Sequence, residues 1–174
     1  SLKKRKDRVC RFCGMKRPAV KFRKDAHLMS DLAGNRNLFS DFECDTCNLN
    51  FGQLFENDLS YFLGISRSLT GSRGKDGIPT FKCADRILEV RSAIVQGNEA
   101  TIVSRKDRFP NFFRKELKTG KTTFTYRKHS YVPNRVYKCI LKWALSVLPE
   151  NEMINYPKAL DFLKGNIAGK SGLL

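Results

Sequence analysis

The strongest periodic pattern of apolar residues lies in residues 45–64, DTCNLNFGQLFENDLSYFLG. Apolar side chains such as Phe55, Leu59 and Phe62 recur there at intervals of three and four residues, which is the repeat of one face of an α-helix. Gly64 follows, and glycine commonly ends a helix. The pattern therefore predicts one helix across residues 45–64.

Upstream of this helix, apolar and charged residues alternate with the period of a β-strand. Val20 and Phe22 alternate with charged residues in a segment that is expected to end at residues 26–27. AGNRN is a turn signal around Gly34, and a second short strand is expected across residues 38–42. The predicted order is strand, turn, strand, helix.

Downstream of Gly64 the pattern divides into three segments. Residues 65–77 are rich in glycine, serine and basic residues, which is typical of a flexible basic linker. Residues 78–128 contain short β-branched and aromatic runs, such as RILEV and TTFTYRK, and turn signals such as GNE, which together predict an antiparallel sheet. Helices are expected across residues 132–165.

The first C-terminal helix is predicted to begin at Pro133, because proline favours the first helical position, and to stop before Pro149. The stripe expected to face the core consists of Val136, Ile140, Trp143 or Ala144, and Val147. A second helix is expected across residues 157–164, with Gly165 at its end.

These elements predict an α+β protein in two parts, an N-terminal module of residues 1–64 and a basic second region of residues 65–174. A chain of 174 residues buries roughly 70% of its unfolded surface, which is enough for a hydrophobic core. The chain has no run of about 18 apolar residues that could cross a bilayer, and its charged start, SLKKRKDRVC, does not resemble a secretory signal. We expect a soluble, cytoplasmic protein with no membrane association.

The net charge of the chain indicates which class of molecule the protein binds. The net charge is +16, from 33 Lys and Arg against 17 Asp and Glu, and such a balance is typical of proteins that bind polyanions. Residues 1–24 hold eleven basic residues and one acidic residue, whereas residues 25–63 hold one basic and seven acidic residues. This distribution favours a basic surface that binds phosphates, which surrounds a group of carboxylates that bind a cation. The alternative is a solvated basic face with unrelated acidic helix positions.

Four of the six cysteines form two Cys-x-x-Cys pairs, CRFCG and CDTCN. Each pair presents two thiolates to one ion, and Gly14 permits the tight turn that the first pair needs. The predicted ligands of a structural zinc ion are Cys10, Cys13, Cys44 and Cys47. A thioredoxin-like redox pair is the first alternative, but it needs only one such motif, near a βαβ unit, and the sequence shows no βαβ pattern. Disulfide bonds are the second alternative, and they are disfavoured in the cytoplasm. Cys83 and Cys139 have no spaced partner and are expected to be buried apolar residues.

The motifs CRFCG, AH, GN and ECDTCN, followed by FG and Glu56, resemble the HNH endonuclease family, specifically its four-cysteine ββα-metal (His-Me finger) subgroup. The resemblance covers roughly residues 8–64, and it implies that zinc holds the ββα-metal fold together. More weakly, YVPNRVYKCILKWALSVLPE resembles the downstream region of longer bacterial HNH proteins, so we expect the chain to be a piece of a longer protein. Bacterial proteins of this kind are often associated with phage defence or mobile elements.

The resemblance implies roles for three polar residues. His27 corresponds to the general base, and the ordinary histidine pKa of about 6.5 suits that task. Asn48 corresponds to the asparagine whose amide oxygen binds a single divalent cation, and Asn35, or Asn37 in its place, to the one that braces the loop and the histidine. The alternatives are a structural histidine, an asparagine favoured near a helix start, and plain turn chemistry.

One position departs from the family. Many HNH enzymes place Asp or Glu directly before the histidine as a second metal ligand, but here that residue is Ala26. Glu56 lies eight residues after Asn48, about 80° around a regular α-helix, so it could approach the cation only from one side. Asp25 is expected to point away from the site. Asn48, Glu56, phosphate oxygens and waters form a plausible ligand set for magnesium or manganese, with Glu56 as an ordinary surface carboxylate the alternative.

Basic residues outside these motifs supply the expected contacts with DNA. They are Arg67, Arg73 and Lys75 in the linker, and Lys121, Arg127 and Lys128 in the last hairpin. Phe124 and Tyr126 in that hairpin suit either stacking on bases or a core. The sequence therefore predicts a metal-dependent HNH endonuclease that hydrolyses DNA. The alternatives are an inactive zinc-containing nucleic-acid-binding module and a zinc-stabilised scaffold that binds an acidic protein.

Overall fold

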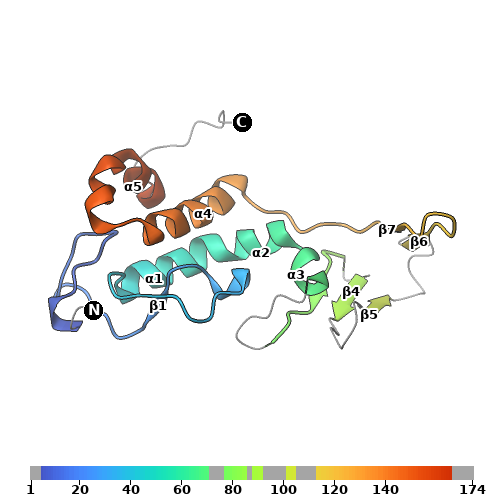
Figure 1. Ribbon diagram of the computed structural model, residues 1–174, viewed down its shortest axis with the longest axis horizontal. Coiled ribbons are helices and arrows are strands. Elements are labelled where there is room, and N and C mark those ends of the chain that lie inside the picture. The colour runs from blue at the N-terminus through green and yellow to red at the C-terminus, as the bar shows by residue number, and fades with distance from the viewer. Residues whose placement is uncertain (1–4, 71–76, 86–87, 92–100, 105–112, 166–174) are drawn as a thin grey trace. The chain divides into compact units, whose positions relative to one another are not determined.

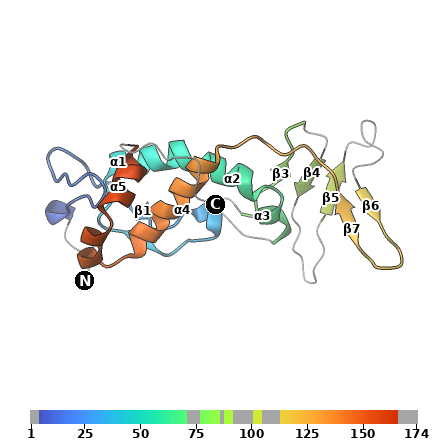
Figure 2. The same ribbon diagram turned by 90° about the horizontal axis from the view of Figure 1, so that it is seen from above.

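The computed structural model describes residues 5–70, 77–85, 88–91, 101–104 and 113–165 (Figure 1, Figure 2). Helices and small antiparallel sheets within these residues confirm the expected α+β class. The chain divides into two compact units, the first made of Ser1–Leu59 with Tyr131–Leu174 and the second of Ser60–Ser130. This division differs from the boundary expected after residue 64, because the C-terminal helices group with the N-terminal segment.

The first unit contains a short β-pair followed by a long helical segment. Its first elements are η1 (Arg5–Asp7), β1 (Ala26–His27), η2 (Asp31–Ala33) and β2 (Phe39–Ser40). The two strands are antiparallel, with Ala26 opposite Ser40 and His27 opposite Phe39. The helical segment consists of α1 (Asp45–Phe51), a π-helical turn η3 (Gly52–Glu56) and α2 (Asn57–Leu63), and the residues of α2 from Ser60 on belong to the second unit. The helix predicted across residues 45–64 is thus confirmed, with a π turn inside it.

The first predicted strand is shorter than expected, since only its last two residues belong to β1. The reason is a local competition for backbone hydrogen bonds. The Asp45 carboxylate accepts hydrogen bonds from the N–H groups of Arg23 and Lys24, at 2.9 and 3.1 Å, so this backbone is bound to the start of α1. Val20 and Phe22 are nevertheless buried, as the alternation indicated.

Helix α4 (Pro133–Val147) is fastened to the N-terminal segment at three points along its length. Near its start, Asp58 accepts a hydrogen bond from the N-cap N–H at 2.6 Å and pairs with Arg135 at 3.3 Å. In its middle, Lys142 pairs with Glu43 at 2.9 Å. Near its end, Arg11 donates to three main-chain carbonyl oxygens at 2.8 to 3.2 Å. These contacts explain why α4 groups with the N-terminal segment.

The predicted core-facing stripe of α4 is right at Val136, whereas Trp143 is half-buried and the other predicted positions are exposed. The buried face carries Val136, Cys139, Lys142 and Leu145. Ile140 and Val147, which were expected in the core, are 47% and 58% exposed. The helix turns Lys142 toward the buried carboxylate of Glu43, and a hydrophobic pattern does not count lysine as a core residue. The expectation of a buried Cys139 is confirmed.

The remaining elements of the first unit close its core. They are η4 (Glu150–Asn155) and α5 (Pro157–Lys164), and Gly165 ends α5 in the left-handed conformation with φ +87°, as predicted. The large buried apolar side chains are Phe12, Val20, Phe22, Phe55, Leu59, Val136, Leu145, Met153 and Leu163. Each contributes about 1.5–3 kcal/mol when fully buried. This core draws on both ends of the chain.

The second unit holds α3 (Ser66–Leu69) and two small sheets (Figure 2). The first sheet has the order β3-β4-β5, with strands β3 (Phe81–Lys82), β4 (Leu88–Arg91) and β5 (Thr101–Ser104). The second is the hairpin of β6 (Phe113–Lys115) and β7 (Thr122–Phe124). All pairs are antiparallel, which confirms the predicted sheet type, and Cys83 is buried as expected.

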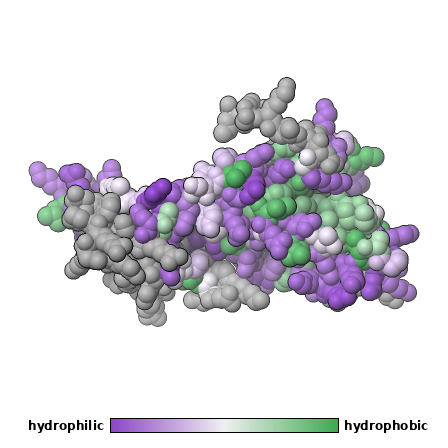
Figure 3. All heavy atoms as spheres, turned by 180° about the vertical axis from the view of Figure 1, so that it is seen from behind, coloured by the Kyte–Doolittle hydropathy of each residue, from purple (hydrophilic) through white to green (hydrophobic). Residues whose placement is uncertain are grey.

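The surface is mainly hydrophilic on the face drawn in Figure 3, with scattered apolar patches. This agrees with a chain that carries 33 Lys and Arg. Among the described helices, none has the length and apolar character needed to span a bilayer.

Candidate metal centre and active site

The four predicted zinc ligands lie together in the first unit. The Sγ atoms of Cys10, Cys13, Cys44 and Cys47 are all within 4.8 Å of one another. The Cys13 and Cys44 sulfurs are 3.9 Å apart, close to the value of about 3.8 Å that a tetrahedron with Zn–S bonds of about 2.3 Å requires. The cluster could therefore hold a structural metal such as zinc.

Local backbone geometry positions both cysteine pairs. In the first pair, Gly14 adopts φ +72° and donates to the Cys10 carbonyl at 2.8 Å, which closes a tight turn that favours glycine. In the second pair, Cys44 is the N-cap of α1, and its Sγ accepts a hydrogen bond from the Cys47 N–H at 3.5 Å. N–H groups directed at sulfur favour the thiolate form that binds metal.

The thiol groups of the cluster cannot all ionise easily on their own. The hydrogen bond from the Cys47 thiol lowers the pKa of Cys10 to about 4, and the same bond raises the pKa of Cys47. Burial raises the pKa of Cys44 to about 11. Four closely spaced thiolates need a positive charge among them, which a divalent ion supplies.

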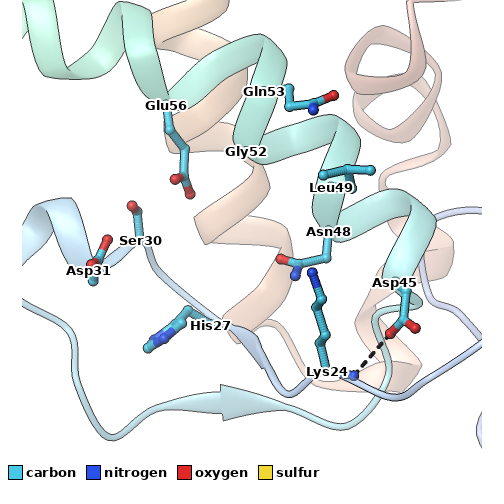
Figure 4. Close-up of a pocket in the computed structure, with 10 residues that line it drawn as sticks. All are labelled: Lys24, His27, Ser30, Asp31, Asp45, Asn48, Leu49, Gly52, Gln53 and Glu56. Atoms are coloured by element: carbon cyan, nitrogen blue, oxygen red, sulfur yellow. Dashed lines mark hydrogen bonds between the residues drawn. The ribbon is translucent and has the colours of Figure 1, made fainter. Parts of the chain in front are cut away.

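A pocket of about 290 Å³ opens beside β1 and the helical segment (Figure 4). It is lined by Lys24, His27, Ser30, Asp31, Asp45, Asn48, Leu49, Gly52, Gln53 and Glu56. Three of these, His27, Asn48 and Glu56, are residues that the sequence singled out for chemistry. The fold brings them to one cavity from separate parts of the chain.

His27 enters the pocket from strand β1. Its ring contacts the ring of Phe39, the residue opposite it on β2, with 4.6 Å between ring centroids. Its Nδ1 atom is enclosed by protein and has no hydrogen-bond partner within the described part of the chain. A buried polar atom without a partner is uncommon and indicates an interaction that a ligand could complete.

Asn48 and Glu56 lie on the same side of the helical segment, facing the pocket (Figure 4). The expected offset of about 80° between them holds for a regular α-helix. The π turn η3 (Gly52–Glu56) has i→i+5 hydrogen bonds and so fits an extra residue into one turn, which reduces the offset between Asn48 and Glu56. The π turn therefore directs Glu56 into the pocket, with Gly52 between it and Asn48.

Pocket residues that the sequence did not single out have identifiable tasks. One oxygen of Asp45 is engaged with the backbone of Arg23 and Lys24, so Asp45 holds the rim of the pocket in place. Lys24 lines the same pocket and adds a positive charge to it (Figure 4). Ser30 accepts from Leu32 N–H at 3.2 Å as the N-cap of η2. The only signal for Asp45 was its place directly after Cys44.

Asn35 braces the loop between β1 and β2. Its Nδ2 donates to the carbonyl oxygens of Met29 and Leu38 at 2.8 and 2.9 Å. Its Oδ1 accepts from the N–H groups of Asn37 and Leu38 at 3.3 and 2.9 Å. The loop-bracing geometry thus belongs to Asn35, and Asn37 contributes through its main chain.

The predicted DNA contacts belong to the second unit. Lys121, Arg127 and Lys128 are exposed, and Arg67 lies half-buried on α3, whereas Arg73 and Lys75 fall outside the described residues. Tyr126 packs edge-on against Phe81 with 5.3 Å between ring centroids, as a core residue does. Lys128 lies 5.1 Å from the ring centroid of the exposed Phe62, which offers a basic and aromatic surface.

Comparison of the chain with models of protein families, with curated proteins and with solved structures gives no match. Function is therefore argued from the site itself.

Proposed function

We propose that this protein is a metal-dependent endonuclease of the HNH type that hydrolyses DNA phosphodiester bonds. The observation that carries the proposal is the convergence of His27, Asn48 and Glu56 on one pocket. Support also comes from the order of short antiparallel strands and helix, and from a four-cysteine cluster that could hold zinc at the start of that helix. The net charge of +16 suits a polyanionic substrate.

In this proposal His27 acts as the general base. It accepts the proton of a water molecule that attacks the phosphorus, and the bond to the leaving sugar oxygen then breaks. Its imidazole lines the pocket, where a ring nitrogen can take that proton. The Lys24 ammonium stabilises the negative charge of the phosphate at the pocket rim.

Oxygen donors in the pocket fit a hard cation. Asn48 offers an amide oxygen and Glu56 a carboxylate, the ligand types that magnesium and manganese prefer. When bound there, such a cation would supply Lewis-acid stabilisation of the charge that develops on the phosphate. Glu56 takes the place of the carboxylate that is missing at Ala26, because the π turn directs it to the face of Asn48.

Asn48→Ala and Glu56→Gln are each expected to lower plasmid cleavage by about 10²-fold, since the first removes an oxygen donor and the second removes the negative charge that attracts the cation. The assay follows conversion of supercoiled plasmid to nicked and linear forms with magnesium or manganese. Gln53→Ala is the matched control, because Gln53 lies on the same helical segment and its amide points away from Asn48 and Glu56 (Figure 4). Cleavage by Glu56→Gln at the wild-type rate would remove Glu56 from the site.

The same assay separates the alternatives. An inactive nucleic-acid-binding module binds DNA with an affinity that falls steeply as salt rises, and cuts no plasmid with any cation. A scaffold for an acidic protein shows neither behaviour. Cleavage that requires a divalent cation, together with salt-sensitive DNA binding, supports the nuclease.

Gly52→Ala is expected to stabilise the protein and to weaken cleavage. Gly52 has helical dihedral angles, φ −59° and ψ −49°, and an added Cβ would meet no atom within 4 Å. Alanine is about 1 kcal/mol more favourable than glycine inside a helix, which corresponds to about 2–4 °C in melting temperature for a chain of this size. The methyl group would occupy space between Asn48 and Glu56 that the substrate needs. Thermal melts and plasmid cleavage measure the two effects, and a stabilised variant with unchanged cleavage would show that no ligand approaches Gly52.

A further inference from the structure

Lys142 is the one lysine among the buried residues of the described chain, with 6% of its surface exposed. Its Nζ lies 2.9 Å from Oε2 of Glu43, whose side chain is fully buried. The same Nζ donates a hydrogen bond of 2.8 Å to the main-chain carbonyl oxygen of His27. A buried ammonium ion is costly unless it is paired and hydrogen-bonded, so these two contacts define where Lys142 sits.

The ammonium group joins three segments that are remote in sequence. Lys142 comes from the middle of α4, Glu43 directly precedes the zinc-cluster residue Cys44, and His27 belongs to β1. One cation therefore fixes the backbone of His27 against the second cysteine pair. The contact is made to the carbonyl group of His27 itself and not to a neighbour.

Such a contact matters because the ring of His27 has little else to orient it. A general base is usually held by a hydrogen bond from its other ring nitrogen to a third group. Here Nδ1 has no partner within the described part of the chain, and the ring packs against Phe39. The direction of the imidazole therefore depends on where its own backbone is held.

We propose that Lys142 is a positioning residue for His27, through which the C-terminal helix α4 sets the orientation of the imidazole in the pocket. This inference rests on the proposed function for its effect on cleavage. The expected effect of Lys142 on the ring of His27 does not depend on the proposed function. The segment from residue 131 onward is then part of the active unit, although none of its described residues lines the pocket.

The test removes both buried charges together. Lys142→Met alone would leave Glu43 as an unpaired buried carboxylate, whereas Lys142→Met with Glu43→Leu replaces the pair by apolar side chains of similar volume, which proteins often tolerate. If that pair does not fold, Lys142→Met with Glu43→Gln takes its place. Arg135→Met is the matched control, because Arg135 anchors the same helix through Asp58 without contacting His27.

We expect the double variant to bind one zinc ion and to melt cooperatively. Its kcat for plasmid cleavage should fall about 10–100-fold while its KM for DNA stays unchanged, because displacement of a catalytic group by about 1 Å can lower the rate about 10²-fold. Arg135→Met should keep the wild-type kcat. Equal kcat for the double variant and the wild type, with unchanged His27 signals, would overturn the proposal.

A second readout does not need cleavage. The chain has only two histidines, so the ring proton signals of His27 and His129 can be separated by NMR. In the double variant the His27 signals should broaden or split, while those of His129, whose ring stacks on Tyr61 and meets the Lys82 carbonyl in the second unit, should stay unchanged. If the wild type cleaves no DNA, the proposed nuclease function fails, and unchanged His27 signals in the variant would separately refute the positioning role.

Discussion

Replacing His27 with alanine is expected to lower plasmid cleavage by about 10²–10⁴-fold, the range that a general base contributes. The loss should appear in kcat, because His27 acts on the attacking water and does not hold the DNA. DNA affinity and zinc content should stay near those of the wild type. The measurement is the initial rate of plasmid nicking with magnesium, at enzyme concentrations that saturate the DNA.

The fold should tolerate His27→Ala because few contacts depend on the ring. Its described contact is with Phe39, and its main-chain carbonyl keeps the hydrogen bond from Lys142 in the variant. His129→Ala is the matched control, since it removes the other histidine and lies in the second unit. Equal nicking by His27→Ala and the wild type would contradict the assignment of the base.

Disruption of the four-cysteine cluster is expected to have the largest effect on stability. Cys44→Ser should abolish stoichiometric zinc binding and the cooperative melting of the first unit, because apparent zinc binding by four-ligand sites is worth about 10–16 kcal/mol and this exceeds the stability of most domains. Cys44 has none of its surface exposed and is the N-cap of α1, so the helix that carries Asn48 loses its fixed start.

Metal analysis and circular dichroism measure this outcome. Cys139→Ala is the control, because Cys139 is buried in the same unit outside the cluster and burial raises its pKa to about 12, which keeps it a neutral thiol. It should retain one zinc per chain. Acidification should release the zinc from the wild type, since protons compete for the thiolates. A protein stripped of metal by a chelator that melts at the wild-type temperature would contradict a structural role for the cluster.

Local patterns predicted the longer helices, because each carries its own stop signal, but they missed α3 (Ser66–Leu69), which lies in the segment expected to be a flexible linker. Pro133 and Gly165 bound the two C-terminal helices where the sequence placed them. The predicted core-facing stripe of α4 differs from the observed one because the ion pair of Lys142 with Glu43 sets the orientation of the helix. These two residues are separated by nearly a hundred positions in the sequence. The strand predicted at Val20 and Phe22 does not form, because the Asp45 carboxylate accepts hydrogen bonds from the N–H groups of Arg23 and Lys24. Both errors arise where a polar side chain overrides the apolar pattern.

The sequence by itself determined the four-cysteine cluster, the ends of the longer helices and the antiparallel type of the sheets, because spacing along the chain fixes which residues share a knuckle or a hairpin and which residues end a helix. Only the tertiary structure decided the rest of the site. The π turn that directs Glu56 toward Asn48, the pocket that unites them with His27, and the Lys142 ammonium that holds the His27 backbone all depend on contacts between remote segments. Such contacts are selected by the packing of the whole first unit, and no local periodicity encodes them.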